Sequence, residues 1–197
     1  MSRTRYKNWV QRTPYEMQRD QIYEKLNKEQ KKIFDFCINT DGNAFIYGSA
    51  GTGKSYLLDG IIKVLRGLCK KTVIVCAPTA MAASILGGTT IHKAFGYSIG
   101  ISATQDKKFL AHAPKIIALT DVIVIDEISQ VRMDTFSSIV KSIEKTNKKR
   151  AKMKPAKPPV RLIVCGDFAQ ISPIISTPTE KQHLDELYGF DVQEPAA

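Results

Sequence analysis

The chain has 197 residues, of which 43% are hydrophobic and 24% charged, and its formal net charge is +10. This length is enough for one well-packed core with extensions, and the composition is ordinary for a globular protein rather than a disordered one. Charged or polar residues interrupt each apolar run before it reaches the length of a membrane span, and residues 1–5 lack the apolar core of a secretory signal. Membrane and secreted classes are therefore not expected.

The four cysteines stand singly, without a C-x-x-C pair, at positions Cys37, Cys69, Cys76 and Cys165. Isolated cysteines within apolar runs are typical of reduced core thiols rather than of a metal or disulfide framework. We therefore expect an intracellular protein (nuclear, cytoplasmic or at a viral replication site). Separately, we expect a monomer.

The first elements precede a glycine-rich loop. Residues 1–25 mix basic, polar and aromatic residues without clear periodicity and are expected to form an extension to the domain. Asn27 is a plausible N-cap for a helix, and a turn at Asp41-Gly42 leads to residues 43–47, an apolar run suited to a buried strand.

Residues 48–55 read G-S-A-G-T-G-K-S and fit the phosphate-binding pattern G-x-x-x-x-G-K-[ST] at every position. Glycines let successive backbone N–H groups point at a polyphosphate. Lys54 can reach the β- and γ-phosphates, and the Ser55 hydroxyl can ligate Mg²⁺. A helix that starts here adds its positive N-terminal dipole.

An amphipathic helix is predicted after the loop, because leucine and isoleucine recur at three- to four-residue spacing from Leu57 to Leu68. Strand, loop and helix are the context that the motif requires. The residues predicted to bind nucleotide are Gly48, Ala50, Gly51, Thr52, Gly53, Lys54, Ser55 and Tyr56.

The middle of the chain predicts a second buried strand at residues 72–77, followed by a short helix of small residues that Gly87-Gly88 interrupts. A lone histidine such as His92 is usually structural. Residues 96–118 are polar and contain Gly96, Gly100 and Pro114, so we expect a long connection there, and such connections tend to be functional.

Residues 122–127 form a third predicted strand, in which four β-branched aliphatic residues lead to Asp126 and Glu127. Since the C-terminal ends of parallel strands share one edge of the sheet, these carboxylates should lie beside the phosphate-binding loop. Asp126 can hold Mg²⁺, and Glu127 can orient and deprotonate the water that attacks the γ-phosphate.

A strongly basic segment follows another amphipathic helix. Residues 141–161 contain nine Lys and Arg residues against Glu144 alone, so this segment carries +8 of the net charge of +10. Because Pro155, Pro158 and Pro159 break up any helix, we expect a basic loop over residues 145–159. Two interpretations stay open: a contact for nucleic-acid phosphates, or a solvated mobile loop.

A fourth strand is predicted at residues 160–165, and Gln170 follows it in a position suited to sensing a γ-phosphate. Alternating strands and helices argue for an α/β fold with a central parallel sheet covered by helices on both faces. We expect the fourth strand to lie between the strand before the loop and the Asp126 strand, because Gln170 must reach the same phosphate.

Five blocks in this order resemble the first motor domain of superfamily 1 helicases of the RecD/Pif type. They cover residues 26–30, 48–55, 77–95 with a gap at 84–87, 122–130 and 166–173. The resemblance implies a RecA-like P-loop NTPase domain 1A over residues 26–176 that uses ATP and Mg²⁺. It implies 5′→3′ translocation on single-stranded DNA and unwinding of duplex or fork DNA.

The resemblance also implies roles for single residues. Gln30 would read adenine, and Gln170, with Lys54 and Glu127, would serve catalysis and couple the γ-phosphate to the grip on DNA. Residues 96–118 occupy the place of a wedge that splits the duplex. The residues implied to contact DNA are Thr79, Thr90, His92, Phe95 and, in the wedge, Phe109.

Such helicases need a second RecA-like domain that supplies arginines to the phosphate, and residues 177–197 read as a tail leading to it. No arginine follows Arg161 in this chain. Because such an arginine contributes on the order of 10³–10⁵ in rate, we expect the 197-residue chain to bind nucleotide, hydrolyse it slowly and not unwind DNA alone.

Besides a nucleic-acid-stimulated NTPase, two alternatives remain. A stand-alone phosphotransferase such as a small nucleotide kinase could use residues 141–161 as a lid, although Glu127 beside Asp126 favours water as the acceptor. A nucleic-acid binder with a vestigial nucleotide site is the other, and the intact Lys54 and Ser55 argue against it.

Overall fold

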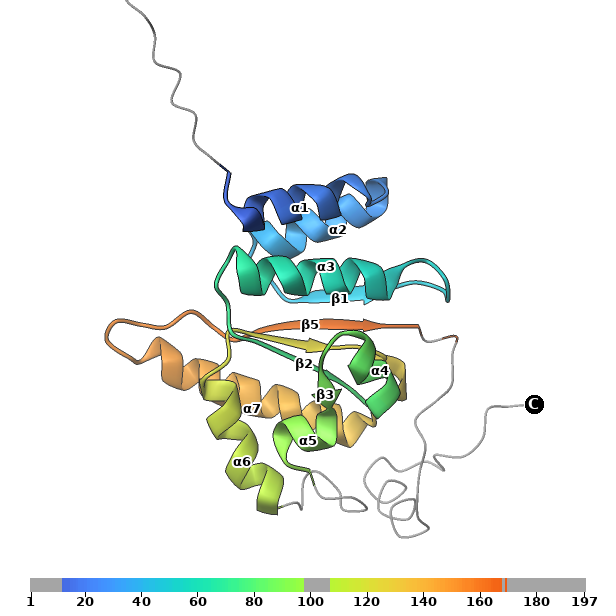
Figure 1. Ribbon diagram of the computed structural model, residues 1–197. Helices are drawn as coiled ribbons and strands as arrows, with labels where there is room; N and C mark the ends of the chain where they lie inside the picture. Colours follow the sequence, from blue (N-terminus) through green and yellow to red (C-terminus); the bar gives the residue numbers. More distant parts are fainter. Residues whose placement is uncertain (1–11, 98–106, 168, 170–197) are drawn as a thin grey trace, which may run out of the picture.

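The computed structural model describes residues 12–97, 107–167 and 169; for residues 107–112 only the backbone is described. Five parallel strands form one sheet in the order β1-β5-β4-β2-β3 (Figure 1). The strands are β1 (Ala44–Tyr47), β2 (Val73–Ala77), β3 (Thr89–Thr90), β4 (Val122–Ile125) and β5 (Arg161–Gly166). The expected position of the fourth predicted strand, here β5, between β1 and β4 is confirmed.

Helices cover both faces of the sheet, as predicted (Figure 1). One face carries α1 (Pro14–Glu24), α2 (Lys28–Asn39) and α3 (Lys54–Gly67). The other carries α5 (Ile91–Phe95), α6 (Lys107–Ala118) and α7 (Met133–Ala151). The short α4 (Ala80–Ile85) packs against β2 and β3.

The core has two halves because side chains alternate across the strands. Val124 and Ile163 pack with the apolar stripe of α3, whereas Ile123 and Ile125 pack with Ile139 of α7. The four residues of β4 are apolar and buried on both faces, which is typical of a strand inside a parallel sheet between two helical layers, whereas the edge strand β1 exposes Phe45 and Tyr47. Because β1 and β4 both pair with β5 in parallel, the C-terminal ends of β1, β4 and β5 meet at one edge of the sheet.

The helix α1 differs from the prediction of an aperiodic extension. It forms because Thr13 and Glu16 make a reciprocal capping box and Pro14 occupies the first turn. No residue of α1 is fully buried, which is why hydrophobic periodicity gave no signal. The helix packs on α3 where Gly60 and Gly67 leave room for Ile22 and Tyr15.

Two further boundaries differ from the sequence prediction. Residues 107–118 of the expected long connection form α6, which packs against α7. The expected basic loop at 145–159 begins only after α7 ends at Ala151. Proline restricts the residue before it, so Pro155 excludes helix from Lys154 onward but not at positions 145–151.

Among the described residues, no helix is both long enough and apolar enough to cross a membrane. All four cysteines are described and free, and three of them are buried, namely Cys37, Cys76 and Cys165. The burial of these three agrees with the expectation of core thiols.

Candidate nucleotide-binding site

The phosphate-binding loop joins the end of β1 to the start of α3. Gly51 and Gly53 adopt left-handed backbone angles, with φ of 76° and 79°, which side chains rarely tolerate. Lys54 begins α3, and no side chain caps this helix. The first N–H groups of α3 therefore have no intrahelical acceptor and can bind an anion.

The Lys54 ammonium lies along the loop. Its Nζ donates to the carbonyls of Gly48 at 2.6 Å and Ser49 at 2.8 Å. The Thr52 hydroxyl also donates to the Ser49 carbonyl, at 2.9 Å. Loop carbonyls thus hold the amine at the phosphate-binding edge, and exchanging them for phosphate oxygens would replace neutral acceptors with negatively charged ones and so strengthen the hydrogen bonds.

Two carboxylates face this loop from the end of β4. Asp126 is 6% exposed, and its Oδ1 accepts the backbone N–H of Glu127 at 2.9 Å. Glu127 has a left-handed backbone, with φ of 51°, and precedes the 3₁₀ helix η1 (Ile128–Gln130). A non-glycine residue in this conformation is uncommon and is often found at functional sites.

Glu127 is half-buried, and burial raises the pKa of its carboxyl, with a second contribution from the nearby Asp126 charge. A raised pKa brings a carboxylate closer to the range in which a general base works near neutral pH. Burial also raises the pKa of the Cys165 thiol to about 12, with Asp126 adding to the effect and Lys54 opposing it. The thiol of β5 is therefore a neutral neighbour of this charged site.

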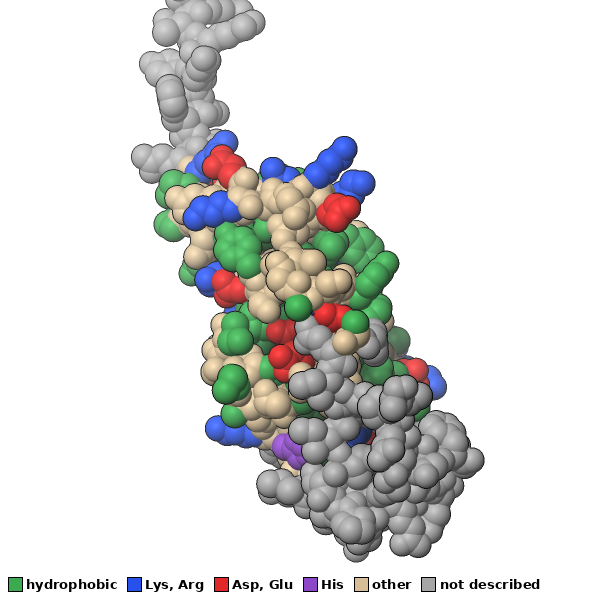
Figure 2. All heavy atoms as spheres, turned by 90° about the vertical axis from the view of Figure 1, so that its right-hand side faces the viewer, with side chains coloured by type: hydrophobic (Ala, Val, Ile, Leu, Met, Phe, Trp, Pro, Cys, Tyr) green, Lys and Arg blue, Asp and Glu red, His purple; other side chains and the backbone are tan. Residues whose placement is uncertain are grey.

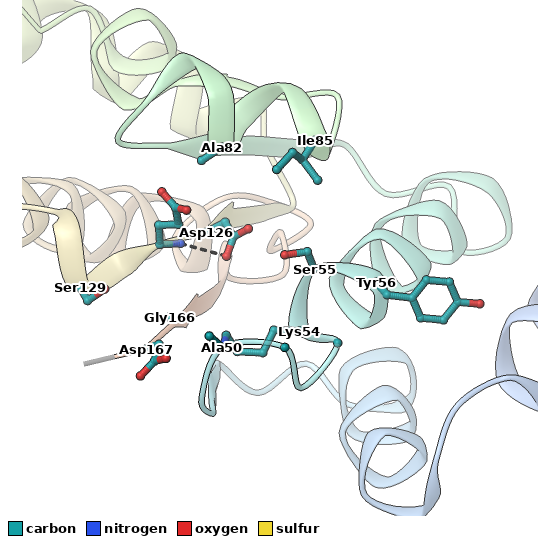
Figure 3. A pocket seen from close by; sticks show the side chains of 13 residues that line it. Ala50, Lys54, Ser55, Tyr56, Ala82, Ile85, Asp126, Ser129, Gly166 and Asp167 are labelled. Atoms are coloured by element: carbon teal, nitrogen blue, oxygen red, sulfur yellow. Dashed lines mark hydrogen bonds between the residues drawn. The ribbon is translucent and has the colours of Figure 1, made fainter. Parts of the chain in front are cut away.

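Lys54, Asp126 and Glu127 line one cavity of about 360 Å³. Figure 3 shows Ser55 of α3 facing Asp126, with Lys54 and Ala50 of the loop and Asp167 after β5 at its border. Figure 2 views this edge of the sheet, where acidic side chains gather near the centre of the face. The volume lies within the range of about 300–1,000 Å³ usual for ligand pockets.

The residues at this edge fit a magnesium ion. Mg²⁺ is usually held by one or two protein oxygens together with water and substrate phosphates, not by a cage of protein ligands. The Ser55 hydroxyl and the Asp126 carboxylate, both lining the cavity, are such a pair. The described residues contain no cluster of three or more His, Cys, Asp or Glu side chains that would hold a metal by themselves.

The sequence also matches a protein family that is described by its function. The sequence profile described as PIF1-like helicase matches residues 25–188. The chain belongs to the PIF1-like helicase family.

Relatives of this PIF1-like chain carry helicase names. It is 34% identical over 180 residues to the ATP-dependent DNA helicase PIF1 of Candida albicans, covering 87% of this chain and 19% of the relative. It is 33% identical over 160 residues to the ATP-dependent DNA helicase RRM3 of Saccharomyces cerevisiae, covering 76% of this chain and 21% of the relative. The chain thus spans about a fifth of the length of these relatives.

Solved Pif1 structures share the fold of this PIF1-like domain. The Pif1 helicase from Bacteroides in complex with ADP-AlF3 and ssDNA superposes with a TM-score of 0.64 at 28% identity, covering 84% of this chain and 37% of that one. The Pif1 helicase from Candida albicans gives a TM-score of 0.58 at 35% identity, covering 76% and 34%. The expected RecA-like fold is confirmed.

Of the residues predicted to bind nucleotide, Gly48, Thr52 and Gln30 do not line the cavity of this PIF1-like site, and Tyr56 lines it without pointing into it. Gln30 does not line the cavity; its Oε1 accepts from the Asn27 N–H at 3.0 Å, and its Nε2 donates to the Thr52 carbonyl at 3.2 Å. Tyr56 lines the cavity, but its ring points away from it (Figure 3). Gln170 lies outside the described residues.

The predicted DNA contacts divide into three kinds. Thr79 and Thr90 are N-caps, whose hydroxyl oxygens accept the N–H groups of Ala82 and Lys93. His92 is exposed and meets Tyr97 edge-on at 5.9 Å between ring centroids. Phe95, by contrast, is fully buried, so its ring packs in the core and presents no surface to DNA. The Phe109 side chain lies outside what the structure describes.

Sequence reasoning missed several residues that line the cavity. Asp167 follows β5 directly, and the rule applied to Asp126, a carboxylate at the end of a parallel strand, could have found it. Ile85 and Ala82 line the cavity from α4, and Ser129 lines it from η1. These three carry no chemical signature, and only the packing of α4 and η1 at this edge brings them there.

Proposed function

We propose that this chain is the ATP-binding motor part of an ATP-dependent DNA helicase, coupling ATP hydrolysis to 5′→3′ translocation on single-stranded DNA and to unwinding of duplex or fork DNA. One observation carries the proposal: a single cavity collects Lys54, Ser55, Asp126 and Glu127. The names of the relatives and the Bacteroides complex with ADP-AlF3 and ssDNA support it.

In this proposal, Lys54 and the first N–H groups of α3 bind the β- and γ-phosphates and orient them at the end of β4. Ser55 and Asp126 hold Mg²⁺, which would neutralise charge on the phosphates. Glu127 positions a water and accepts its proton, which its raised pKa favours. Gln170 would sense the γ-phosphate, and Gln30 would read the adenine ring.

DNA would lie across α4 and α5. The exposed side chains of Thr79 and His92, with the half-buried Thr90, are the contacts we propose there. Residues 96–118, including Phe109, are proposed as the wedge that splits the duplex, and a second RecA-like domain as the partner that supplies arginines to the phosphate. We further propose an intracellular monomer that serves DNA replication, repair or recombination.

The nucleotide site is tested with fluorescent ATP. Lys54→Ala should weaken binding by about 10- to 100-fold, the effect of losing a charged hydrogen bond of about 1.5–3 kcal/mol. Lys63→Ala on the exposed side of α3, where Lys63 pairs with Asp59, is the matched control and should bind normally. Equal affinities for the two variants would defeat the assignment of the phosphate site.

Hydrolysis tests the catalytic assignment. In a protein that also contains the second motor domain, and with single-stranded DNA present, Glu127→Gln should lower phosphate release by about 10²- to 10⁴-fold, as expected for a general base, while ATP still binds. Transfer of the γ-phosphate to a nucleotide acceptor, rather than to water, would instead identify a phosphotransferase.

A further inference from the structure

A row of exposed lysines runs along the outer face of α7 and continues into the loop behind it. The helix contributes Lys141, Lys145, Lys148 and Lys149, and the loop contributes Lys152, Lys154 and Lys157. All seven are exposed, and none forms an ion pair with a residue in the ranges that the structure describes. We call these seven residues the basic ridge.

The two arginines of residues 141–161 do not belong to the basic ridge. Arg150 and Arg161 are buried, at 6% and 5% exposure. Arg150 donates to the carbonyls of Pro158 at 3.0 Å, Ala118 at 3.0 Å and Thr120 at 2.6 Å. These arginines therefore hold the backbone and cannot serve as surface charges.

The loop of the basic ridge is fastened to α7. Besides the Arg150 contacts, the Lys157 N–H donates to the Arg150 carbonyl at 3.2 Å. Asn147 donates to the Val160 carbonyl at 3.3 Å and accepts the Val160 N–H at 2.7 Å. The three lysines of the loop thus sit beside the end of α7, so ordering them on a ligand costs less conformational entropy than ordering a loose tail.

The ridge and the nucleotide cavity lie at opposite ends of β5. The loop 152–159 precedes Arg161, where β5 starts, whereas Gly166, at its end, lines the cavity. In Figure 1, the loop after α7 lies on the left and the phosphate-binding loop on the right. The ridge is thus a separate surface of the domain.

The chemistry of the ridge favours a nucleic-acid duplex. Lysines four residues apart on a helix lie about 6 Å apart, within reach of successive phosphates of one strand. Residues 141–159 contain no aromatic residue on which unpaired bases could stack. The apolar face of α7 is buried against the sheet, so this helix has no face left to insert into a lipid surface.

We propose that the basic ridge binds the phosphate backbone of duplex DNA without reading its sequence, at a distance from the nucleotide site. The choice of DNA rests on the proposed helicase function, whereas the preference for a polyanion rests on the charges alone. In a motor domain, this contact would hold the duplex while α4 and α5 engage the single strand.

The test compares two triple variants of equal charge by measuring binding of a labelled blunt duplex over a salt series. Lys145→Gln, Lys148→Gln and Lys152→Gln remove three charges from the ridge. Lys25→Gln, Lys32→Gln and Lys63→Gln remove three exposed charges from the end of α1, from α2 and from α3 as the control. ATP binding confirms that both variants are folded.

The ridge variant should bind the duplex at least tenfold more weakly at low salt. Its plot of log K against log[salt] should be shallower by about 2–3, since each phosphate that a lysine no longer neutralises lowers the slope by about 0.9. The control should retain the wild-type slope. Equal losses of affinity in both variants, or an unchanged slope in the ridge variant, would overturn the proposal. Because no hydrolysis is measured, failure of the helicase assignment would appear separately, in the Glu127→Gln assay.

Discussion

The side-chain amide of Gln30 donates a hydrogen bond to the backbone carbonyl of Thr52 at 3.2 Å and so joins the start of α2 to the phosphate-binding loop. The same amide closes the capping box of α2 through its oxygen. A methyl group added at Gly53 would lie 2.8 Å from Nε2. Gln30 therefore packs against the loop at the residue that precedes Lys54.

This contact predicts an effect of Gln30 on phosphate binding, separate from any reading of the base. Gln30→Glu keeps an oxygen for the Asn27 N–H but cannot donate to Thr52. We expect affinity for inorganic triphosphate and for ATP to fall by about 3- to 10-fold, in line with a net hydrogen bond of about 1 kcal/mol. Because Gln30→Glu also adds a negative charge, Gln21→Glu at an exposed position of α1 is the control for the charge.

Competition titrations against fluorescent ATP measure both affinities. If triphosphate binds Gln30→Glu as tightly as wild type, while discrimination between ATP and GTP is lost, the side chain acts on the base alone.

Glu127 predicts a pH-dependent stability. Its pKa is raised above the ordinary value of 4.5, by burial first and by Asp126 second. A raised carboxyl pKa stabilises the folded state below the unfolded-state pKa, and this contribution is lost as pH rises through the folded-state pKa. Glu127→Gln should therefore melt higher than wild type at pH 8, with the difference shrinking toward pH 4.

Thermal melts at several pH values check this, with Glu24→Gln at an exposed position of α1 as a control for the loss of one charge. A melting difference that stays constant from pH 4 to pH 8 would speak against a raised pKa at Glu127.

Gly166, at the end of β5, controls the turn that carries Glu127. A methyl group added there would lie 2.7 Å from Ile128 Cγ2 and 3.2 Å from the Ile128 backbone nitrogen. In a protein that also contains the second motor domain, Gly166→Ala should displace η1 and lower DNA-stimulated hydrolysis by at least tenfold, while ATP binding, which depends on Lys54, changes less. Gly42→Ala, where the added methyl would lie 3.1 Å from the tip of the exposed Phe36 ring and 3.7 Å from the Thr40 hydroxyl oxygen, is the control.

Steady-state kinetics together with nucleotide titration separate the two effects. Normal turnover by Gly166→Ala would show that the contact between β5 and η1 does not set the position of Glu127.

Arg161 predicts a large effect on stability rather than on DNA binding. Its Nη1 donates to the Cys37 carbonyl at 2.6 Å, and its Nε donates to the Gly42 carbonyl. Arg161→Met leaves two carbonyls near the buried end of β5 without these donors and should lower the free energy of unfolding by about 2–4 kcal/mol.

Urea denaturation measures the change. Arg66→Met is the matched control, because Arg66 also donates to a backbone carbonyl, that of Val73 at 3.0 Å, but is exposed, so its loss should cost about 1 kcal/mol or less. Similar losses of stability in the two variants would contradict the role given to burial.

The sequence predicted the parallel sheet, the place of β5 and the meeting of Lys54 with Asp126, because glycine spacing, β-branched runs and the shared edge of parallel strands are local rules. It did not predict α1, whose signals are the caps Thr13 and Glu16 rather than an apolar stripe. It also counted Arg150 as surface charge. Arg150 is instead buried and donates to the backbone carbonyls of Ala118 and Thr120, which lie about 30 residues earlier in the chain. No local sequence pattern predicts such a distant contact.

Within the site, residues with a chemical signature were predictable and residues placed by packing were not. Asp126 and Glu127 follow an evident strand, whereas Ile85 reaches the cavity only because α4 packs on β2 and β3. Phe95 is a residue for which the sequence resemblance predicted a functional role that its packing does not allow. Its sequence block resembles one that contacts DNA in related helicases, yet the side chain belongs to the core.

The cysteines also determine how the domain can be labelled. Burial raises the pKa of Cys37, and it raises the pKa of Cys76 and of Cys165 to about 12, so these thiols remain protonated and shielded at neutral pH. Cys69, just beyond the end of α3 and far along that helix from Lys54, is partly exposed. A maleimide dye should therefore attach at one position of the native chain without any cysteine replacement, leaving the phosphate-binding loop unmodified.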